Sequence, residues 1–161
     1  MKIGRVTLSD RAHAGVYEDL SGPEIERVVR EQIDPAADIL VRLLPDEKND
    51  IEAALVELSD TLGCELIVTT GGTGPFPRDV TPEATKAVLE RELPGFGETM
   101  RAVSFAKVPT AILSRALAGT RGKTLIINLP GNPRAIAECL PPLVPAIREC
   151  LRHLRESAAR D

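Results

Sequence analysis

Two short runs of uninterrupted aliphatic residues constrain the fold of this chain more than any other feature. Leu66-Ile67-Val68 lies within an expected strand, Glu65–Thr70, and Leu125-Ile126-Ile127 lies within another, Thr124–Leu129. A strand that is apolar at consecutive positions is buried on both faces, which is typical of the central strands of a parallel sheet. The sequence therefore predicts a sheet that is covered by helices on both sides.

Strand-like and helix-like patterns alternate along the rest of the chain. Further strands are expected at Lys2–Leu8 and Ile39–Leu44, with Ala111–Leu117 as an additional strand. Helices are expected at Pro23–Gln32, from Asn49 through Leu62, from Thr81 to about Glu92, from Pro133 through Leu140, and at Leu143–Glu156. This alternation predicts one domain over residues 1–161, with a three-layer α/β/α fold, a mostly parallel central sheet and right-handed crossovers. The charged residues 155–161 are expected to form a frayed tail.

Polar residues at the expected helix starts support this assignment. Asn49 is followed by Glu52 at the spacing of a capping box. Thr81 and Asn132 each precede a proline, which is favoured at the first position of a helix. We therefore expect each of these three residues to cap a helix with its side chain.

The composition excludes several classes of protein. The chain has 161 residues, no Trp, one Tyr and three Phe, so its core must be largely aliphatic. A formal net charge of −4 without a basic block argues against nucleic acid as the main partner. No segment approaches the run of about 20 apolar residues that a membrane helix needs, and the N-terminus lacks the apolar core of a signal peptide.

Three cysteines, Cys64, Cys139 and Cys150, are widely separated in the sequence. Their odd number and the absence of CxxC spacing argue against a disulfide framework or a zinc site. We expect them to be small buried residues, and we expect a reducing, cytoplasmic location.

Polar loops follow the four strands that the sequence predicts as neighbours, and each begins where its strand ends. They contain Ser9-Asp10-Arg11, Pro45-Asp46-Glu47, Gly71-Gly72-Thr73-Gly74 and Pro130-Gly131-Asn132-Pro133. In open α/β sheets, ligands bind at the carboxyl ends of the strands. We therefore expect these loops to meet in one site.

The loop Gly71–Gly74 is the expected floor of that site, because glycines let consecutive N–H groups approach an anion. It matches neither the Walker A motif nor the dinucleotide-binding motif, and a tight turn could equally explain its glycines. Asp46 and Asp79 are the expected ligands of a Mg²⁺ ion that also contacts phosphate oxygens. The alternatives are a turn role for Asp46 and a capping or ion-pair role for Asp79. Four arginines, at positions 11, 78, 101 and 115, are spare cations near the expected site or solvated surface charges.

Ordered motifs along essentially the whole chain resemble the molybdopterin adenylyltransferase family of the Mog type. These motifs are Thr7–Arg11, Gly15–Asp19, Thr69–Gly74, Arg78–Thr85, Pro94–Glu98, Pro109–Arg115 and Ile127–Pro133. The chain is also similar to the matching domains of eukaryotic cofactor-synthesis proteins, including gephyrin. The stretch Phe76-Pro77 interrupts the match where family members vary.

The resemblance implies an activity and a set of site residues. The terminal phosphate of molybdopterin attacks the α-phosphorus of ATP, which gives adenylyl-molybdopterin and pyrophosphate. Asp46 and Asp79 match the acidic positions for adenylylation and metal binding. The positions matched to substrate or nucleotide binding are Ser9, Asp10, Gly71, Gly72, Thr73, Gly74, Ser104, Asn128, Pro130 and Gly131. A homotrimer is implied, as is transfer of the product to an enzyme that inserts molybdenum or tungsten.

Other functions remain open from the sequence alone. Molybdenum-insertion enzymes carry a related domain but are much longer. A non-catalytic scaffold or pterin-binding module would not need both carboxylates. A related pyrophosphatase-type domain shares the glycine loop but not the motifs at Thr7–Arg11 and Pro109–Arg115.

Overall fold

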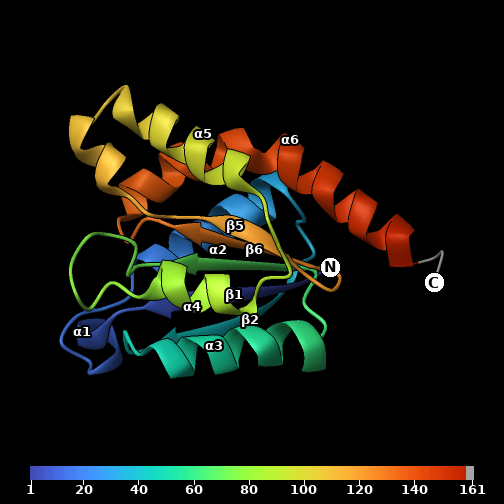
Figure 1. Cartoon of the computed structure of the whole chain (residues 1–161), viewed down its shortest axis with the longest axis horizontal. Helices are drawn as coiled ribbons and strands as arrows, with labels where there is room; N and C mark the ends of the chain where they lie inside the picture. Colours follow the sequence, from blue (N-terminus) through green and yellow to red (C-terminus); the bar gives the residue numbers. More distant parts are fainter. Residues whose placement is uncertain (159–161) are drawn as a thin grey trace.

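The computed structural model describes residues 1–158, which fold around one six-stranded sheet with the strand order β2-β1-β3-β6-β5-β4 (Figure 1). The strands are β1 (Lys2–Leu8), β2 (Asp38–Leu44), β3 (Leu66–Thr70), β4 (Arg91–Glu92), β5 (Ala118–Arg121) and β6 (Thr124–Leu129). The first four in the spatial order are parallel, and β5 and β4 extend the sheet in antiparallel fashion. The expected three-layer α/β/α fold with a mostly parallel sheet is confirmed.

Helices cover both faces of the sheet (Figure 1). They are α1 (Asp10–His13), α2 (Ser21–Gln32), α3 (Lys48–Val56), the π-helical turn η1 (Glu57–Thr61), α4 (Thr81–Val88), α5 (Pro94–Phe105), the 3₁₀ turn η2 (Pro109–Leu113) and α6 (Pro133–Ala158). Helices α2, α5 and α6 pack on one face, and α3 and α4 pack on the other. None of the helices in residues 1–158 combines the length and the apolar character that crossing a membrane requires.

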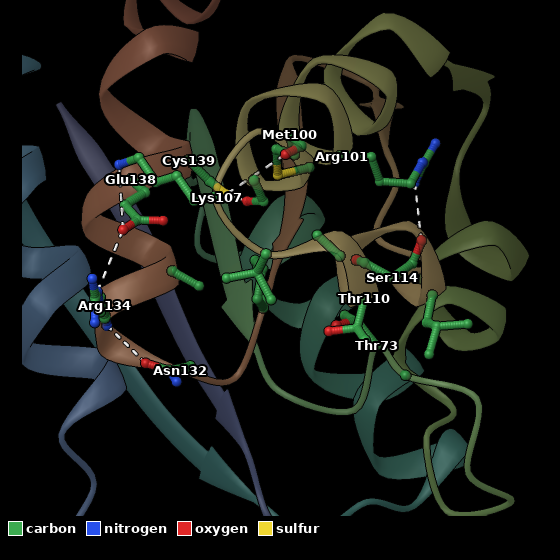
Figure 2. Close-up of a pocket in the computed structure, with 17 residues that line it drawn as sticks. Thr73, Met100, Arg101, Lys107, Thr110, Ser114, Asn132, Arg134, Glu138 and Cys139 are labelled. Atoms are coloured by element: carbon green, nitrogen blue, oxygen red, sulfur yellow. Dashed lines mark hydrogen bonds and ion pairs between the residues drawn. The ribbon is translucent and has the colours of Figure 1, made fainter.

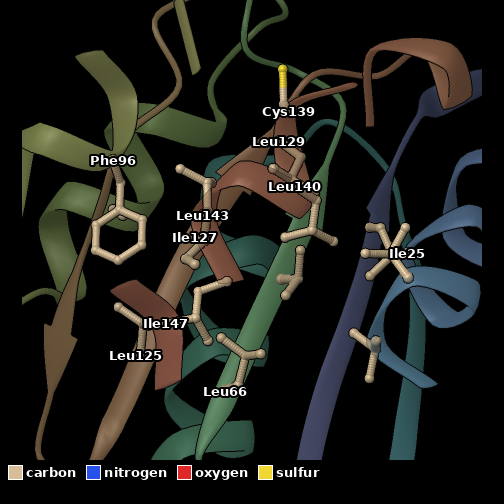
Figure 3. Close-up of a cluster of buried hydrophobic side chains, with 14 of the residues drawn as sticks. Ile25, Leu66, Phe96, Leu125, Ile127, Leu129, Cys139, Leu140, Leu143 and Ile147 are labelled. Atoms are coloured by element: carbon tan, nitrogen blue, oxygen red, sulfur yellow. The ribbon is translucent and has the colours of Figure 1, made fainter. Parts of the chain in front are cut away.

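The continuous aliphatic run in β3 supplies both layers of the core. Leu66 and Val68 point into the cluster beneath α2, α5 and α6 (Figure 3), whereas Ile67 points into the cluster beneath α3 and α4. This follows from the alternation of side chains across a strand. All three side chains are fully buried, and each contributes about 1.5–3 kcal/mol through removal from water.

The additional strand expected at Ala111–Leu117 is absent from the structure. This region contains η2 and an irregular segment, and Ile112 and Leu113 are exposed. The strand β5 follows instead at Ala118–Arg121, where Gly119 passes so close to Arg91 that a Cβ would lie 2.3 Å from the Arg91 carbonyl oxygen. The first three residues of β5 are small, so its sequence lacks the alternation of aliphatic residues that predicts a strand.

The C-terminal helix is longer than expected. Instead of two helices, α6 runs without interruption from Pro133 to Ala158 and contains three prolines, Pro141, Pro142 and Pro145. Buried aliphatic residues of α6 at helical spacing pack on the sheet (Figure 3), and they are Ile136, Leu140, Leu143, Ile147 and Leu151. Their burial offsets the backbone hydrogen bonds that proline cannot donate. Of the expected frayed tail, residues 155–158 belong to α6, and residues 159–161 lie outside the described residues.

The expected helix caps are only partly correct. The Asn132 side-chain oxygen accepts the N–H of Arg134 at 2.9 Å, as expected. Helix α3 begins at Lys48 without a side-chain cap, so the role predicted for Asn49 is wrong. Helix α4 ends at Val88, earlier than expected, and Thr81 is its first residue rather than its cap.

Candidate active site

The four polar loops meet at one edge of the sheet because the parallel strands end in register. Leu8 lies opposite Leu44 in the β1–β2 pairing, and Thr70 lies opposite Leu129 in the β3–β6 pairing. Thr7 lies opposite Thr70 in the pairing between β1 and β3. The predicted convergence of the loops is therefore confirmed.

The loop Gly71–Gly74 has a conformation that requires glycine at its first two positions. Gly71 has φ of 97° and Gly72 has φ of 62°, in the region that residues with a Cβ rarely adopt. A Cβ on Gly71 would lie 2.2 Å from the Leu8 carbonyl oxygen. Within residues 1–158, the N–H groups of Gly72, Thr73 and Gly74 donate to no protein acceptor, so consecutive donors remain free for an anion.

Hydrogen bonds from neighbouring loops hold this glycine loop in place. The Thr81 hydroxyl, at the first residue of α4, donates to the Gly71 carbonyl at 2.9 Å. The Thr70 hydroxyl donates to the Pro130 carbonyl at 2.6 Å. The loop after β6 is packed against the loop after β3, because a Cβ on Gly131 would lie 3.2 Å from the Cα of Gly71.

Asp46 lies beside the glycine loop and is joined to Asp10 by reciprocal hydrogen bonds. The Asp10 N–H donates to Asp46 Oδ2 and the Asp46 N–H donates to Asp10 Oδ1, each at 3.0 Å. Asp46 Oδ1 is buried and has no hydrogen-bond partner among the described residues. It lies 3.0 Å from the position of a Cβ on Gly72, so the missing side chain leaves room for this oxygen.

The environment of Asp46 disfavours its charged form. Burial raises the pKa of the Asp46 carboxyl above its ordinary value, and the nearby charges of Asp10 and Asp79 raise it further. The hydrogen bond from the Asp10 N–H and the positive charge of Arg78 oppose this shift. A cation placed between Asp46 and Asp79 would relieve the repulsion between them.

Asp79 is positioned by its own loop and by Arg115. The Phe76 N–H donates to Asp79 Oδ2 at 3.0 Å, and a Cβ on Gly74 would lie 2.8 Å from that oxygen. The Arg115 guanidinium donates to the Gly74 carbonyl at 2.9 Å and to the Asp79 carbonyl at 2.6 Å, and it pairs with Glu83. Arg115 therefore connects the two ends of the segment between the glycine loop and Asp79.

Three of the four arginines expected as spare cations are engaged by protein groups. Arg78 forms two hydrogen bonds with the Asp10 carboxylate and a third with Glu47, and it lowers the pKa of Asp10. Arg101 donates to two backbone carbonyls. Arg115 bonds as described above. Arg11 lies over the Tyr17 ring, with its guanidinium carbon 5.2 Å from the ring centroid.

Two cavities open on either side of the glycine loop. The smaller, of about 370 Å³, is lined by Thr7, Leu8, Ser9, Ala12, Tyr17, Glu18, Asp19, Leu20, Ser21, Asp46, Thr70, Gly71, Gly72, Asp79, Gly131 and Pro133. The larger, of about 660 Å³, is lined by Thr73, Gly74, Met100, Arg101, Ser104, Lys107, Val108, Thr110, Ala111, Leu113, Ser114, Pro130, Asn132, Arg134, Ala135, Glu138 and Cys139. Gly72 lines the smaller cavity and Thr73 and Gly74 line the larger, so the segment that carries the free N–H groups borders both cavities.

Side chains of α5, α6 and the segment around η2 surround the larger cavity (Figure 2). Glu138 pairs with Lys107 and with Arg134, at 3.3 and 3.5 Å. The Ser104 hydroxyl lies 2.9 Å from the Cys139 sulfur, and burial raises the pKa of the Cys139 thiol. Lys107 and Arg134 are thus cationic side chains at the larger cavity, and Glu138 is the one carboxylate among its described lining residues. The smaller cavity is lined by several carboxylates, including Asp46 and Asp79.

The structure places most of the predicted site residues in these cavities. Ser9, Asp46, Gly71, Gly72, Asp79 and Gly131 line the smaller one, and Thr73, Gly74, Ser104 and Pro130 line the larger one. Asp10 lines neither and instead bonds to Arg78 and Asp46. Asn128 is fully buried in β6 and donates to the hydroxyls of Thr69 and Thr85, so the structure gives it no direct contact with either cavity.

Several residues that line these cavities carry no motif role that the sequence pattern predicts. Tyr17 lines the smaller cavity, and Lys107, Arg134 and Glu138 line the larger one. Tyr17 lay within a recognised motif, and its aromatic character in a chain with one tyrosine was a usable signal. The other three lie on helix surfaces or in a connecting segment, where charged residues carry no distinctive pattern.

Metal binding by protein groups alone is not supported. In residues 1–158, no group of three or more His, Cys, Asp and Glu side chains is arranged to hold a metal ion. Asp46 and Asp79 therefore offer an incomplete set of oxygen ligands, which suits an ion whose remaining ligands come from a substrate and water.

Fold and site together define an α/β protein with a candidate ligand site at the carboxyl edge of parallel strands, where a glycine loop with free N–H groups lies beside two carboxylates. Residues 4–149 match the family described as "Probable molybdopterin binding domain", and the chain belongs to this family. The resemblance inferred from the sequence motifs is confirmed.

Individual relatives agree with this family assignment. The chain is 53% identical to the molybdopterin adenylyltransferase of Helicobacter pylori J99 over 149 residues, which cover 92% of this chain and 85% of the relative. It is 51% identical to the molybdopterin adenylyltransferase of Escherichia coli K12 over 140 residues, covering 87% and 72%. The crystal structure of the molybdopterin biosynthesis enzyme MoaB from Thermus thermophilus superposes with a TM-score of 0.87 at 40% identity, covering 95% of each chain.

Proposed function

We propose that this chain is a molybdopterin adenylyltransferase. It transfers the adenylyl group of ATP to the terminal phosphate of molybdopterin, in the biosynthesis of the molybdenum cofactor. A phosphate oxygen of molybdopterin forms a bond to the α-phosphorus of ATP, the bond from that phosphorus to the bridging oxygen breaks, and pyrophosphate leaves. The naming of relatives that are 51–54% identical supports this activity.

The observation that carries the proposal is that the glycine loop, with its free N–H groups, borders both cavities. Two phosphorylated substrates must bring their phosphates together for this reaction, and the residues with free N–H groups, Gly72, Thr73 and Gly74, are consecutive and border one cavity or the other. These donors are fixed before the substrates arrive, so they can stabilise developing charge without reorganisation. The incoming phosphate is already ionised near neutral pH, so the reaction needs alignment rather than a general base.

The distribution of carboxylates supports an assignment of the substrates to the cavities. ATP occupies the smaller cavity, which contains Asp46 and Asp79, and molybdopterin occupies the larger one, which contains Ser104. Asp46 and Asp79 would hold Mg²⁺, and the buried, unpartnered Oδ1 of Asp46 is the observation that fits such an ion. When bound there, Mg²⁺ neutralises negative charge on the phosphate oxygens of the nucleotide.

Residues of this chain fix the positions of both carboxylates. Asp10 orients Asp46 through the reciprocal hydrogen bonds, and Arg78 in turn holds Asp10. Arg115 fixes the backbone at Asp79. We also propose that the protein acts as a homotrimer in the cytoplasm and passes adenylyl-molybdopterin to a metal-insertion enzyme, as the family resemblance implies.

The test is pyrophosphate release by the purified protein with molybdopterin, ATP and Mg²⁺. Asp79→Asn is expected to slow this release by about a hundredfold or more, while binding of molybdopterin survives. Asp60→Asn is the matched control, because Asp60 pairs with Arg121 and lines neither cavity, and it should leave turnover unchanged. Absence of pyrophosphate release by the unmodified protein would contradict the function. Loss of molybdopterin binding in Asp79→Asn would contradict the metal role.

A further inference from the structure

We propose that Tyr17 is the residue on which the adenine ring of the nucleotide stacks in the smaller cavity. The inference rests on the proposed use of ATP and goes beyond it, because it names the group that recognises the base. It is drawn from the position of Tyr17, from the scarcity of aromatic residues in the chain, and from the difference between the two cavities.

Tyr17 is held in a fixed position at the smaller cavity. Its hydroxyl lies 2.7 Å from the Ser9 hydroxyl, and Ser9 itself caps α1 by accepting the Ala12 N–H at 3.2 Å. The guanidinium of Arg11 lies over the ring. About half of the residue, 48%, nevertheless remains exposed beside the cavity. A tyrosine that served only to pack would be expected to bury its ring.

The segment that carries Tyr17 is anchored by a buried polar network. Asp19 Oδ2 accepts hydrogen bonds at 2.7 Å from both Arg5 and Thr7, and Asp19 Oδ1 accepts the Gly22 N–H at 2.9 Å. Arg5 is only 8% exposed. Asp19 follows Tyr17 by two residues, so this network fixes the backbone on the C-terminal side of Tyr17. The contact with Ser9 fixes the ring itself. The ring is therefore preorganised for a ligand.

No other aromatic ring of the described chain borders the smaller cavity. The chain has one Tyr, three Phe and no Trp. Phe96 is buried beneath α5, and neither Phe76 nor Phe105 lines either cavity. Purine rings stack on aromatic side chains, and loss of such a ring typically weakens binding about tenfold or more.

The contents of the cavities favour adenine over the pterin as the ring that stacks on Tyr17. The smaller cavity combines Asp46, Asp79 and Gly72, which suit a polyphosphate with its cation. The base of a nucleotide is tethered to those phosphates, and Tyr17 belongs to the same cavity. The larger cavity has no aromatic lining residue within the described chain. The pterin is therefore held there by other means, and the tyrosine is available to the nucleotide.

A direct binding test uses the intrinsic fluorescence of the protein. Because the chain has a single tyrosine and no tryptophan, the emission excited in the tyrosine band, where phenylalanine does not absorb, comes from Tyr17 alone. ATP and AMP should quench this emission saturably, whereas tripolyphosphate should leave it unchanged. Free tyrosinamide titrated with the same nucleotides corrects for their absorption of light. An equal response to tripolyphosphate, no saturable quenching by ATP, or quenching by a pterin phosphate alone would each overturn the proposal.

Kinetic measurements on variants separate stacking from a structural role. Tyr17→Leu should raise the KM for ATP about tenfold and leave the KM for molybdopterin unchanged. Tyr17→Phe keeps the ring and loses only the Ser9 contact, so its KM for ATP should stay within about twofold of the unmodified protein. Phe105→Leu is the control for an exposed aromatic residue outside both cavities and should change neither constant.

The outcomes distinguish this inference from the proposed function. Turnover by the unmodified protein together with an unchanged KM for ATP in Tyr17→Leu would remove the stacking role and leave the function standing. Saturable quenching by ATP without pyrophosphate release would leave the nucleotide site standing and remove the function. A rise of both KM values in Tyr17→Leu, with a lowered melting temperature, would show a structural role and overturn the stacking role.

Discussion

Replacing Gly71 by alanine should destabilise the protein far more than an ordinary surface substitution. Two effects add at this position. The φ of 97° costs a residue with a Cβ about 1–3 kcal/mol. The new Cβ would also lie 2.2 Å from the Leu8 carbonyl oxygen, whereas a carbon and an oxygen normally approach to about 3.3 Å, and such overpacking costs about 1–3 kcal/mol more. The reduced freedom of the unfolded chain returns about 0.4–1 kcal/mol, so the net loss is about 2–5 kcal/mol.

Gly63→Ala is the matched control for this substitution. Gly63 has φ of 66°, so alanine is strained there too, but nothing lies within 4 Å of its Cβ position. Only the backbone effect operates, and the expected loss is about 1 kcal/mol. The difference between the two variants therefore reports the contact with Leu8 together with the larger φ of Gly71.

Urea unfolding followed by circular dichroism at one fixed protein concentration measures both variants. With an m-value of about 2 kcal/mol per M, Gly71→Ala should lower the midpoint by roughly 1–2.5 M, and Gly63→Ala by about half a molar unit. The slope m should stay the same in both. Equal midpoints for the two variants would refute the reasoning, because they would show that the strand end at Leu8 moves away at no cost.

Two further predictions concern the carboxylates and their support. Asp46→Asn should raise the free energy of unfolding at neutral pH while stopping turnover. Because the folded pKa of Asp46 is raised, its stabilising contribution is present below the unfolded pKa and is lost as pH rises through the folded pKa. The advantage of Asn over Asp should thus grow with pH in urea titrations, and a constant difference would contradict it. Arg115→Met should raise the Mg²⁺ concentration needed for half-maximal turnover by severalfold, with Arg115→Lys intermediate, because only arginine can bond to Gly74 and Asp79 together. An unchanged Mg²⁺ requirement in Arg115→Met would remove that positioning role.

The parallel part of the sheet could be predicted because its strands carry their own burial pattern. The limits of β1 and β6 match the expected ones, since Lys2–Leu8 and Thr124–Leu129 each contribute aliphatic side chains to the core clusters on both faces of the sheet. The antiparallel edge could not be predicted in the same way. Its strand β5 depends on a close approach between Gly119 and Arg91, which is a tertiary contact that no local pattern records.

The unbroken helix α6 shows a second limit of local reasoning. Proline normally ends a helix, so Pro141 and Pro142 predicted a boundary. The structure keeps one helix because residues on both sides of the prolines, including Leu140 and Leu143, face the same core cluster. The favourable burial is a property of the assembled sheet and helix, and it outweighs the local penalty.

For the site, the residues that the sequence identified are those fixed by the backbone. Gly71 lies where the chain approaches Leu8 too closely for a Cβ, Gly131 lies in tight contact with Gly71, and Asp46 and Asp79 lie in the loops that follow strands. The Asn128 side-chain NH₂ donates to two buried hydroxyls and its Oδ1 has no partner among the described residues, so its predicted role in binding stays a prediction. Distinguishing these roles requires knowing which face of β6 each residue occupies.

The two cavities differ in how freely they can change during evolution. The smaller one is built from the ends of the central parallel strands, where Gly71, Gly131 and Asp46 leave little tolerance for substitution. Much of the larger one is built from α5 and η2, which in the sequence connect β4 and β5, the two short antiparallel strands at the edge of the sheet. We expect descendants of this domain to acquire new acceptor molecules through substitutions in α5 and η2 at the larger cavity. The chemistry at the smaller cavity should persist. Libraries that randomise the α5–η2 segment are accordingly the efficient way to engineer acceptor preference in this scaffold.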